Sequence, residues 1–260
     1  MNKKIIGGSK KKRLLKKDKK NQPLITIITV VLNNKKFLQK TINSVLNQSY
    51  KNYELIVIDG KSTDGTVNIL KKNNSKIDFW ISEKDKGIYD AMNKGMRISR
   101  GSIIVILNSD DIFYKNALKM AVKYFIQNKS IDFLFGSVKK YKLLYGYKPW
   151  KIKWSFGFYS THSIGFFIKK NSQKKVGFYN TKYKYSSDYD FFYRMIVKYK
   201  LIGMATKKNE IFGKFRRGGF SSKISFMDYL SETIKIRLDN GQNILLVSTI
   251  FLLKYAKYLI

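Results

Sequence analysis

The sequence predicts an α/β fold with a mostly parallel central sheet flanked by helices, and three observations support this prediction. Short apolar runs typical of buried strands alternate with segments of helical periodicity across the first half of the chain. Strands separated by helices of roughly ten residues favour parallel pairing with right-handed crossovers. Polar residues directly follow each expected strand, at the edge where ligands bind in sheets of this type.

The expected elements alternate in chain order as far as residue 107. Strands are expected at residues 24–32, 53–58, 77–81 and 103–107, and helices at residues 37–47, 66–72 and 88–98. The last of these strands is apolar without interruption, which is typical of a strand buried on both faces. The pattern weakens beyond Asn116. There we expect a helix to about Phe125, strands at 131–136 and 164–168, a hairpin around Gly146 and a helix at 189–199.

Charge and hydropathy divide the chain into three parts. The first 20 residues carry nine lysines and Arg13 against Asp18, a net charge of +9 with little apolar surface. We therefore expect residues 1–22 to be a disordered basic tail. Residues 23–222 are expected to form the α/β domain. Residues 223–260 are expected to form a C-terminal extension of two helices, at about 225–239 and 243–260.

The composition limits the chemistry and the location of the protein. The chain carries 52 basic and 17 acidic residues, and its net charge of +35 attracts anions such as nucleic acid, acidic lipids or phosphorylated substrates. The absence of cysteine excludes disulfides, thiolate zinc sites and cysteine nucleophiles. The basic N-terminus lacks the apolar stretch of a signal peptide, and no uninterrupted run of about 18 apolar residues occurs. We therefore expect a cytoplasmic protein.

Two adjacent carboxylates, Asp110 and Asp111, follow the expected strand at 103–107. Neighbouring carboxylates repel each other unless a cation or solvent compensates their charge. Hard oxygen ligands favour Mg²⁺ or Mn²⁺, which can keep coordination positions open for phosphate oxygens. A solvated turn or a helix cap explains the pair equally well from its position alone.

Further motifs point to a known family. The segments are Pro23 to Val30, Val57 to Thr66, Ser82 to Gly95, Leu107 to Asp111 and Ser187 to Arg194. In this order and spacing they resemble the family 2 glycosyltransferases with a GT-A fold, of the colanic-acid and surface-polysaccharide biosynthesis type. The resemblance covers about residues 23–220. It implies a Rossmann-like sheet and transfer of a sugar, with inversion, from a nucleotide diphosphate donor, most commonly a UDP-sugar, to an acceptor hydroxyl.

The resemblance also implies which residues bind the donor and a cation, Mn²⁺ or Mg²⁺. The residues implied at the nucleotide-sugar site are Thr29, Asn33, Asp59, Lys86, Asp90, Asn93 or Lys94, and Asn108. Arg217 is added from its own segment, because Arg216-Arg217-Gly218-Gly219 can form a basic loop with glycine hinges that closes over the diphosphate, and a solvated turn is the alternative. The metal ligands implied are Asp110 first and Asp111 second, with His162 as a further candidate. Asn108 departs from the family pattern, which has aspartate at this position. Because asparagine carries no charge, we expect weaker metal binding.

The segment Ser187 to Arg194 contains two aspartates with different expected roles. Asp188 lies three and four residues before Phe191 and Phe192, so it points toward the packed side of its helix. Asp190 lies four residues before Arg194, the spacing of a surface ion pair. We therefore assign the catalytic base that the resemblance implies to Asp188, and a supporting role to Asp190. A helix cap is the alternative for Asp188.

The sequence alone also allows other functions and partners. The charge also fits a nucleic-acid-binding protein, although no binding module is present. A sugar nucleotidyltransferase should carry a glycine-rich phosphate loop near the first strand, and this sequence has no such glycines there. Asn108 also fits an inactive glycosyltransferase-like scaffold.

The expected acceptor is a glycan or a lipid-linked glycan. The apolar segment 244–260 suggests an interfacial helix which, with the basic tail, holds the protein on the inner face of an anionic membrane. A packed helix or a dimer contact is the alternative.

Overall fold

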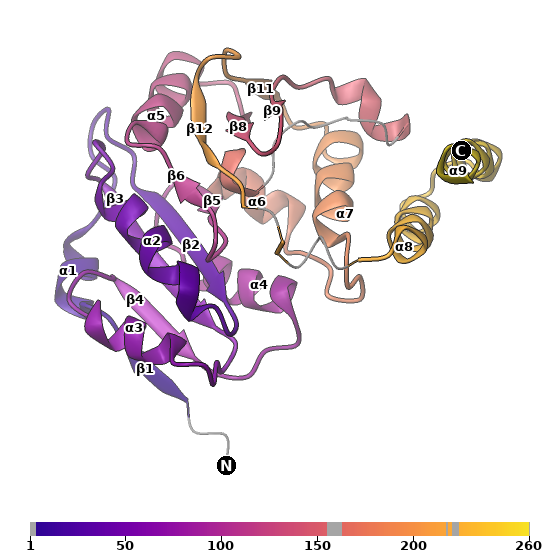
Figure 1. Ribbon diagram of the computed structural model, residues 1–260. Helices are drawn as coiled ribbons and strands as arrows, with labels where there is room; N and C mark the ends of the chain where they lie inside the picture. The colour runs from indigo at the N-terminus through magenta and orange to yellow at the C-terminus, as the bar shows by residue number, and fades with distance from the viewer. Residues whose placement is uncertain (1–3, 155–162, 217, 220–223, 260) are drawn as a thin grey trace.

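The computed structural model describes residues 4–154, 163–216, 218–219 and 224–259. Its first half alternates strands and helices as predicted (Figure 1). The elements are β2 (Ile25–Val31), α2 (Lys35–Leu46), β3 (Tyr53–Asp59), α3 (Thr66–Lys72), β4 (Phe79–Ser82), α4 (Ile88–Ile98) and β5 (Ile103–Ile106). β2 lies between β3 and β5 and pairs in parallel with both, and β3 pairs in parallel with β4. The predicted α/β fold with a mostly parallel sheet is confirmed.

The second half completes this sheet and adds a smaller one. The elements are β6 (Ile112–Phe113), α5 (Ala117–Gln127), β7 (Phe133–Phe135), β8 (Ser137–Lys139), β9 (Leu143–Leu144), β10 (Phe166–Lys169), α6 (Lys170–Val176), β11 (Gly203–Ala205) and β12 (Ile211–Lys214). With β1 (Ile5–Gly7) at one edge, the large sheet has the order β1-β4-β3-β2-β5-β10-β7-β11, and the small sheet has the order β6-β12-β8-β9. β6 follows the Asp110-Asp111 pair and pairs with β12, which brings the loop after β12 to the end of β5.

The helices cover both faces of the large sheet, and two apolar clusters form the core. Leu38 of α2, Leu70 of α3 and Leu118 of α5 belong to the first cluster, whereas α4, α6 and α7 (Ser187–Tyr193) contribute to the second. Alternate residues of β2 enter the two clusters, as a strand buried on both faces requires. Gly95 lets α4 approach β2 closely, because a Cβ there would lie 2.3 Å from Cγ2 of Ile28. This packing sets the N-terminus of α4 near the carboxyl end of β2.

The N-terminal segment is ordered against the sheet, so the expected disorder is wrong for residues 4–22. β1 (Ile5–Gly7) pairs with β4, and α1 (Lys10–Leu15) follows it. Arg13 pairs with Glu54 at 3.0 Å, and Lys16 with Asp78 at 2.6 Å. Both carboxylates are buried, and a buried charge requires a partner. These long-range pairs order a segment whose local composition favours disorder.

Replacement of Arg13 by alanine is expected to lower the free energy of unfolding by about 3 kcal/mol, because it leaves the Glu54 carboxylate buried without its cation. Urea denaturation measures this change. Lys4→Ala is the matched control in the same segment, because Lys4 is exposed and lies 3.8 Å from a half-buried Glu83. Equal stability of Arg13→Ala and the unchanged chain would contradict the docking of this segment.

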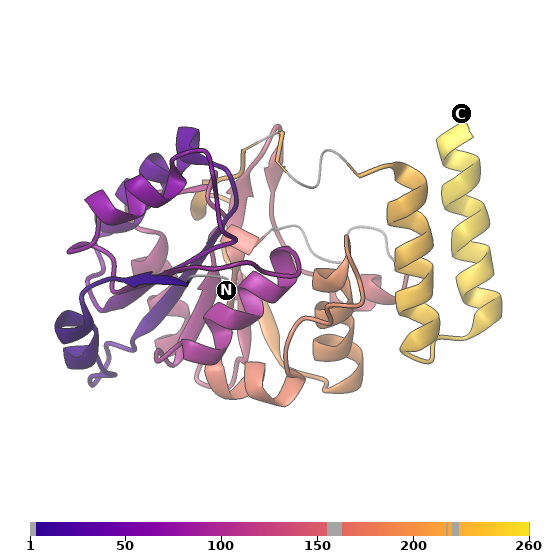
Figure 2. The ribbon, with the colours of Figure 1, turned by 90° about the horizontal axis from the view of Figure 1, so that it is seen from below.

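The chain ends in a helical hairpin at the side of the molecule opposite α1 (Figures 1 and 2). α8 (Phe226–Asp239) packs against α7, and α9 (Ile244–Leu259) packs on the outside of α8. The two predicted helices are therefore present, but a domain boundary near residue 222 stays a prediction. In the described part of the chain, no helix has the length and hydropathy that crossing a bilayer requires.

Candidate active site

A cavity of about 600 Å³ lies beyond the carboxyl ends of β2 and β5. Three groups of residues line it. They are residues 30–34 at and just after the end of β2, and 108–110 after β5; Asp85, Gly87, Ile88, Tyr89, Ala91 and Met92 around the start of α4; and Ser163, Phe166, Tyr179, Tyr185, Asp188, Phe192, Phe215, Arg216, Gly218 and Gly219 from the second half. Ligands bind at this edge of open α/β sheets, because loops can converge there without disturbing the core.

Asp188 lines this cavity from the first turn of α7. Its Oδ1 accepts a hydrogen bond from the Tyr189 amide at 2.9 Å and lies 3.2 Å from the Tyr89 hydroxyl. Burial raises the pKa of the Asp188 carboxyl, and these hydrogen bonds partly oppose the rise. A carboxylate with a raised pKa accepts a proton more readily near neutral pH, which suits a general base.

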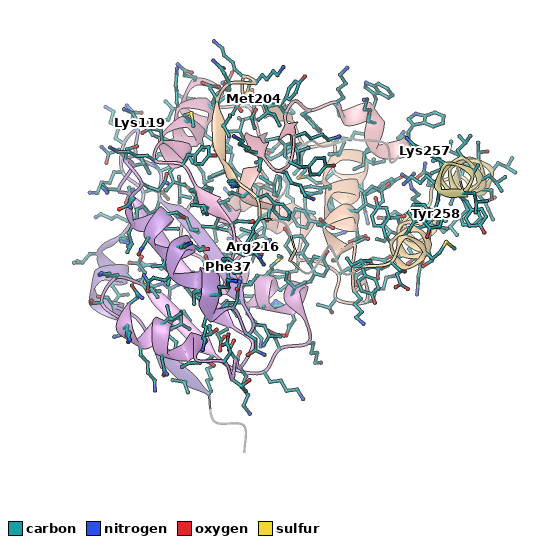
Figure 3. The ribbon with its side chains drawn as sticks, viewed as in Figure 1. Phe37, Lys119, Met204, Arg216, Lys257 and Tyr258 are labelled. Atoms are coloured by element: carbon teal, nitrogen blue, oxygen red, sulfur yellow. The ribbon has the colours of Figure 1, made fainter. Side chains whose placement is uncertain are left out.

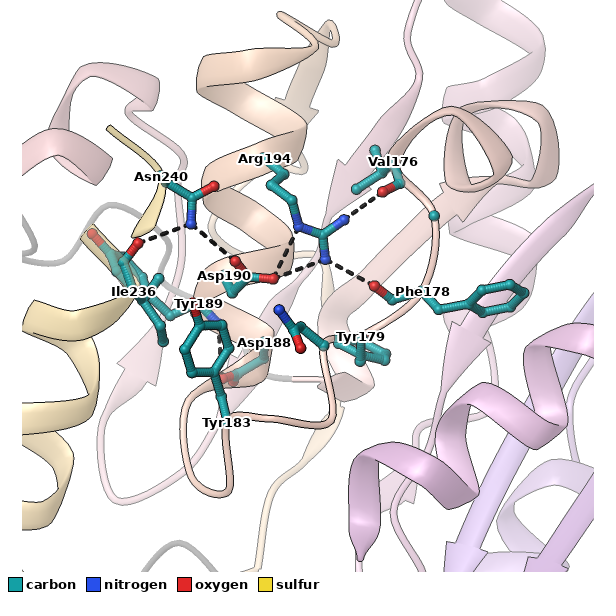
Figure 4. A network of polar contacts seen from close by, with 12 residues as sticks. Val176, Phe178, Tyr179, Tyr183, Asp188, Tyr189, Asp190, Arg194, Ile236 and Asn240 are labelled. Atoms are coloured by element: carbon teal, nitrogen blue, oxygen red, sulfur yellow. Dashed lines mark hydrogen bonds and ion pairs between the residues drawn. The ribbon is translucent and has the colours of Figure 1, made fainter. Parts of the chain in front are cut away.

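Asp190 is buried, with 2% of its surface exposed, and is not the surface group that the sequence predicted. Its predicted partner is present, since Arg194 pairs with Asp190 at 2.9 Å (Figure 4). Arg194 also donates to the carbonyl groups of Val176 and Phe178, and Asn240 donates to Asp190 at 3.0 Å. Asp190 therefore ties α7 to its surroundings, and the helix continues as a π-helix over Arg194–Lys198.

Asp110 and Asp188 line the same cavity, although 78 residues of sequence separate them. Asp110 pairs with Nε of Arg216 at 3.2 Å. The Arg216 guanidinium also lies 3.9 Å from the centre of the Phe37 ring, and Figure 3 shows the two side chains together. A cation of the protein therefore lies beside the carboxylate that we expect to bind metal.

Asp111 is fully buried and lies outside the cavity lining, which argues against its role as a metal ligand. Its Oδ1 accepts a hydrogen bond from the Arg216 amide at 3.1 Å. Burial and the neighbouring charge of Asp110 raise the pKa of Asp111 well above its ordinary value. Asp111 therefore holds the backbone at Arg216.

The donor set for a metal ion is sparse in the described residues. They contain no group of three or more His, Cys, Asp or Glu side chains that could hold a metal. His162 and Arg217 lie outside them. Asn108 lines the cavity, and its Oδ1 is buried with no hydrogen-bond partner in the described part of the protein. Asp110 and Asn108 thus fit a cation that takes its other ligands from a bound molecule.

Thr29 and Asn33 were predicted to edge the nucleotide pocket at the first strand. Of these two residues, Asn33 lines the cavity. Its Oδ1 accepts a hydrogen bond from the Thr63 amide at 2.8 Å, which joins the loops after β2 and β3. Thr29 is buried within β2 and does not line the cavity. Asp59 is also fully buried, and Ser62 and Ser82 donate hydrogen bonds to it. Asp59 therefore shapes the loop after β3 and does not line the pocket.

The donor-site residues expected on α4 also lie outside the lining. Asn93 is buried and exchanges two hydrogen bonds with the Tyr179 backbone, at 2.8 and 2.9 Å. Asp90 accepts a hydrogen bond from the Lys86 amide at 3.0 Å, and Lys94 pairs with Glu83 at 3.1 Å. These contacts stabilise the start of α4 and dock the 179 segment on it, and a role of these residues in donor binding stays a prediction.

With this geometry established, comparison with known proteins identifies the family. The model of Glycosyl transferase family 2 matches residues 26–204, well over half of the chain. The chain belongs to this family.

Relatives and solved structures of glycosyltransferases agree. An uncharacterised glycosyltransferase of Methanocaldococcus jannaschii is 30% identical over 62% of this chain and 60% of its own length. The Escherichia coli UDP-Glc:alpha-D-GlcNAc-diphosphoundecaprenol beta-1,3-glucosyltransferase WfgD is 35% identical over 43% of this chain and 44% of its own length. S. aureus TarS in complex with UDP-GlcNAc has a TM-score of 0.66 at 17% identity, over 82% of this chain and 65% of that chain. This likeness confirms the GT-A fold. The chain spans less than two thirds of the length of the two curated relatives.

Several residues that line the site of this family 2 glycosyltransferase were not predicted from its sequence. Asp85 accepts a hydrogen bond from the Gly87 amide at 2.9 Å, and burial raises its pKa. Its place in the Ser82 to Gly95 segment was the available signal. Arg216 stands in the loop for which the sequence favoured Arg217. Tyr89, Tyr179 and Tyr185 carried no signal, because a single tyrosine in a sequence of 18 tyrosines does not show whether it lines a pocket.

Proposed function

We propose that the protein transfers a sugar, with inversion, from a nucleotide diphosphate sugar to an acceptor hydroxyl in glycan or surface-polysaccharide assembly. The observation that carries this proposal is the presence of Asp188 and Asp110 in one cavity at the carboxyl edge of the sheet. A UDP-sugar is the first donor to test, because the names of WfgD and of the TarS complex contain one.

In the proposed mechanism Asp188 takes the proton of the acceptor hydroxyl. The acceptor oxygen forms a bond to the anomeric carbon of the sugar as the bond from that carbon to the diphosphate oxygen breaks. The proton stays on Asp188, and the electron pair leaves with the nucleoside diphosphate. General base catalysis of this kind contributes about 10²–10⁴-fold. Phe192 and Tyr179 beside the base exclude water from this side of the cavity.

The charge of the leaving diphosphate requires compensation. Arg216 supplies one positive charge at the cavity, beside Asp110. We propose that Asp110, with Asn108, also holds Mn²⁺ or Mg²⁺ together with the diphosphate. When bound, the cation stabilises the negative charge of the leaving group. A structural neighbour, the mannosyltransferase PcManGT from Pyrobaculum calidifontis, was solved in complex with GDP-Man and Mn²⁺, which supports Mn²⁺ as the metal to test. That complex has a TM-score of 0.64 at 16% identity, over 93% of this chain and 73% of that chain.

A hydrolysis and transfer screen tests the proposed function. The full chain is incubated with UDP-, GDP- and TDP-sugars, with Mn²⁺ or with a chelator, and release of the nucleoside diphosphate is measured. Release that depends on the sugar nucleotide and is lost in Asp188→Asn is the expected result. Binding of RNA without binding of any sugar nucleotide would instead favour the nucleic-acid alternative.

We further propose that the outer face of α9 binds an anionic membrane surface and brings the active site to a lipid-linked acceptor. Leu245, Leu252 and Leu259 recur every seven residues and are exposed by 56% or more, as is Leu253. α9 contains no acidic residue, and the chain carries a net charge of +35, which suits an anionic surface. Trp150 is also exposed, three residues before Lys153, whose carbonyl accepts a hydrogen bond from Arg237 of α8. The N-terminal segment lies at the opposite end and cannot share this face (Figure 1).

Leu245→Ser with Leu252→Ser is expected to reduce binding to vesicles of anionic phospholipid about tenfold or more, because two leucines lose their apolar contact with the lipid. Leu14→Ser with Leu15→Ser is the matched control, since these leucines of α1 are equally exposed at the other end. Co-sedimentation measures the bound fraction. If the chain instead forms a dimer that only the α9 variant abolishes, a second copy and not lipid covers this face.

A further inference from the structure

The C-terminal hairpin contacts the segment that carries Asp188, although it lies outside the residues that the family model matches. The side of α8 that faces α7 carries Glu232, Asp239 and, just after its end, Asn240. Asp239 accepts a hydrogen bond from the Tyr183 hydroxyl at 2.6 Å, and Asn240 donates to Asp190 at 3.0 Å. Figure 4 shows the Asn240 contact. The hairpin is thus built into the surroundings of the active site.

Glu232 makes the densest of these contacts. Its Oε1 accepts a hydrogen bond from the Lys184 amide at 2.6 Å, and its Oε2 accepts from the amides of Tyr185 and Ser186 at 2.7 and 2.6 Å. Three consecutive peptide groups therefore point at one carboxylate. Hydrogen bonds to an ionised acceptor are roughly twice as strong as neutral ones, so the carboxylate fixes the direction of this turn.

The turn leads directly to the proposed base. Ser186 precedes α7, and Asp188 is the second residue of that helix. The Tyr185 carbonyl lies 3.0 Å from the Tyr89 hydroxyl, which lies 3.2 Å from Asp188 Oδ1. Tyr89, Tyr185 and Asp188 all line the cavity. A rotation of the 184–186 peptides would therefore move Asp188. It would also move the Tyr185 carbonyl, which orients the Tyr89 hydroxyl beside Asp188.

We propose that Glu232 is a positioning residue for Asp188, so that α8 completes the active site from outside the matched domain. Glu232 itself does not line the cavity. It acts by holding the turn at 184–186. The inference rests on the proposed function, because it takes Asp188 as the base. Its consequence is that a loss of Glu232 lowers turnover and leaves donor binding intact.

Glu232→Gln tests this inference. A glutamine keeps the size of the side chain, but its amide nitrogen cannot accept, so at least one of the three amides loses its partner. We expect kcat to fall by about 10–100-fold, because a displacement of about 1 Å can cost 10²-fold in rate. The UDP dissociation constant and the donor KM should stay within about twofold. Asp228→Asn, an exposed carboxylate on the same helix, is the matched control and should keep wild-type kcat.

A double-mutant cycle separates positioning from general stabilisation. In an Asp188→Asn background, Glu232→Gln should lower the remaining rate by less than about twofold, because the group that it positions is gone. Equal losses in both backgrounds, or an unchanged kcat in Glu232→Gln, would overturn the inference. If Glu232→Gln fails to fold, Glu232→Asp, which keeps the charge, takes its place in the cycle with the same criteria. An unsubstituted chain that binds no nucleoside diphosphate and transfers no sugar would overturn the proposed function instead.

Discussion

Replacement of Asp188 by asparagine lowers turnover by about 10²–10⁴-fold in our prediction and leaves donor binding close to that of the unsubstituted chain. Asparagine has nearly the same shape as aspartate but cannot accept the acceptor's proton. The change removes a negative charge from a partly buried site, which lowers rather than raises the cost of folding. Single-turnover kinetics give the chemical rate, and calorimetry with UDP gives the donor affinity.

The pH dependence of turnover provides an independent measure of the same residue. A general base works only when it is deprotonated, so kcat should rise with pH through the pKa of Asp188. Because burial raises this pKa, the rise should occur above the ordinary range of an aspartate. The rise should be missing in Asp188→Asn. A pH profile that is the same in both proteins would assign the rise to another group.

Asp190→Asn is the matched control for Asp188→Asn. It makes the same chemical change two residues further along α7, where the carboxylate pairs with Arg194 and does not line the cavity. We expect it to lower the melting temperature and to leave kcat of the folded protein nearly unchanged. Turnover that survives in Asp188→Asn but collapses in Asp190→Asn would reverse our assignment of the two roles.

Replacement of Asp110 by alanine is expected to weaken the binding of Mn²⁺ and of the donor together. Loss of a second-shell partner already costs about 10–100-fold in metal affinity, and loss of a ligand should cost at least as much. The same change frees Arg216 from its ion pair. Without metal, UDP should therefore bind Asp110→Ala at least as well as it binds the unsubstituted chain.

Calorimetry with UDP, in Mn²⁺ and in chelator, measures both parts of this prediction. Asn108→Asp is the converse variant, because it adds a carboxylate to that of Asp110 at the proposed metal site, and it should raise Mn²⁺ affinity. Normal Mn²⁺-dependent UDP binding in Asp110→Ala would remove Asp110 from the metal site. In that case Arg216 would be the charge that stabilises the diphosphate.

Local patterns were sufficient for the first half of the fold. The strands ending near Asp59 and Leu107 are apolar runs bounded by polar residues, and the helix at 88–98 has one apolar face, so each element is encoded within about ten residues. The segments around Asp110 and Asp188 were recognised by their resemblance to motifs of the family, which are also short and local in sequence. The short strands β6, β11 and β12 were missed, because two to four residues carry too little periodicity to stand out from a loop.

Only the tertiary structure decided which polar groups line the cavity. Asp59, Asn93 and Asp111 stand in the right motifs but are buried, whereas Asp85 and Arg216 lie at the surface of the pocket. Arg13 orders a lysine-rich segment by pairing with Glu54, and Glu232 reaches a turn 46 to 48 residues away. Strand and helix periodicity depends on neighbours in sequence. The direction of a single side chain, and the partner of a buried charge, depend on residues that only folding brings near.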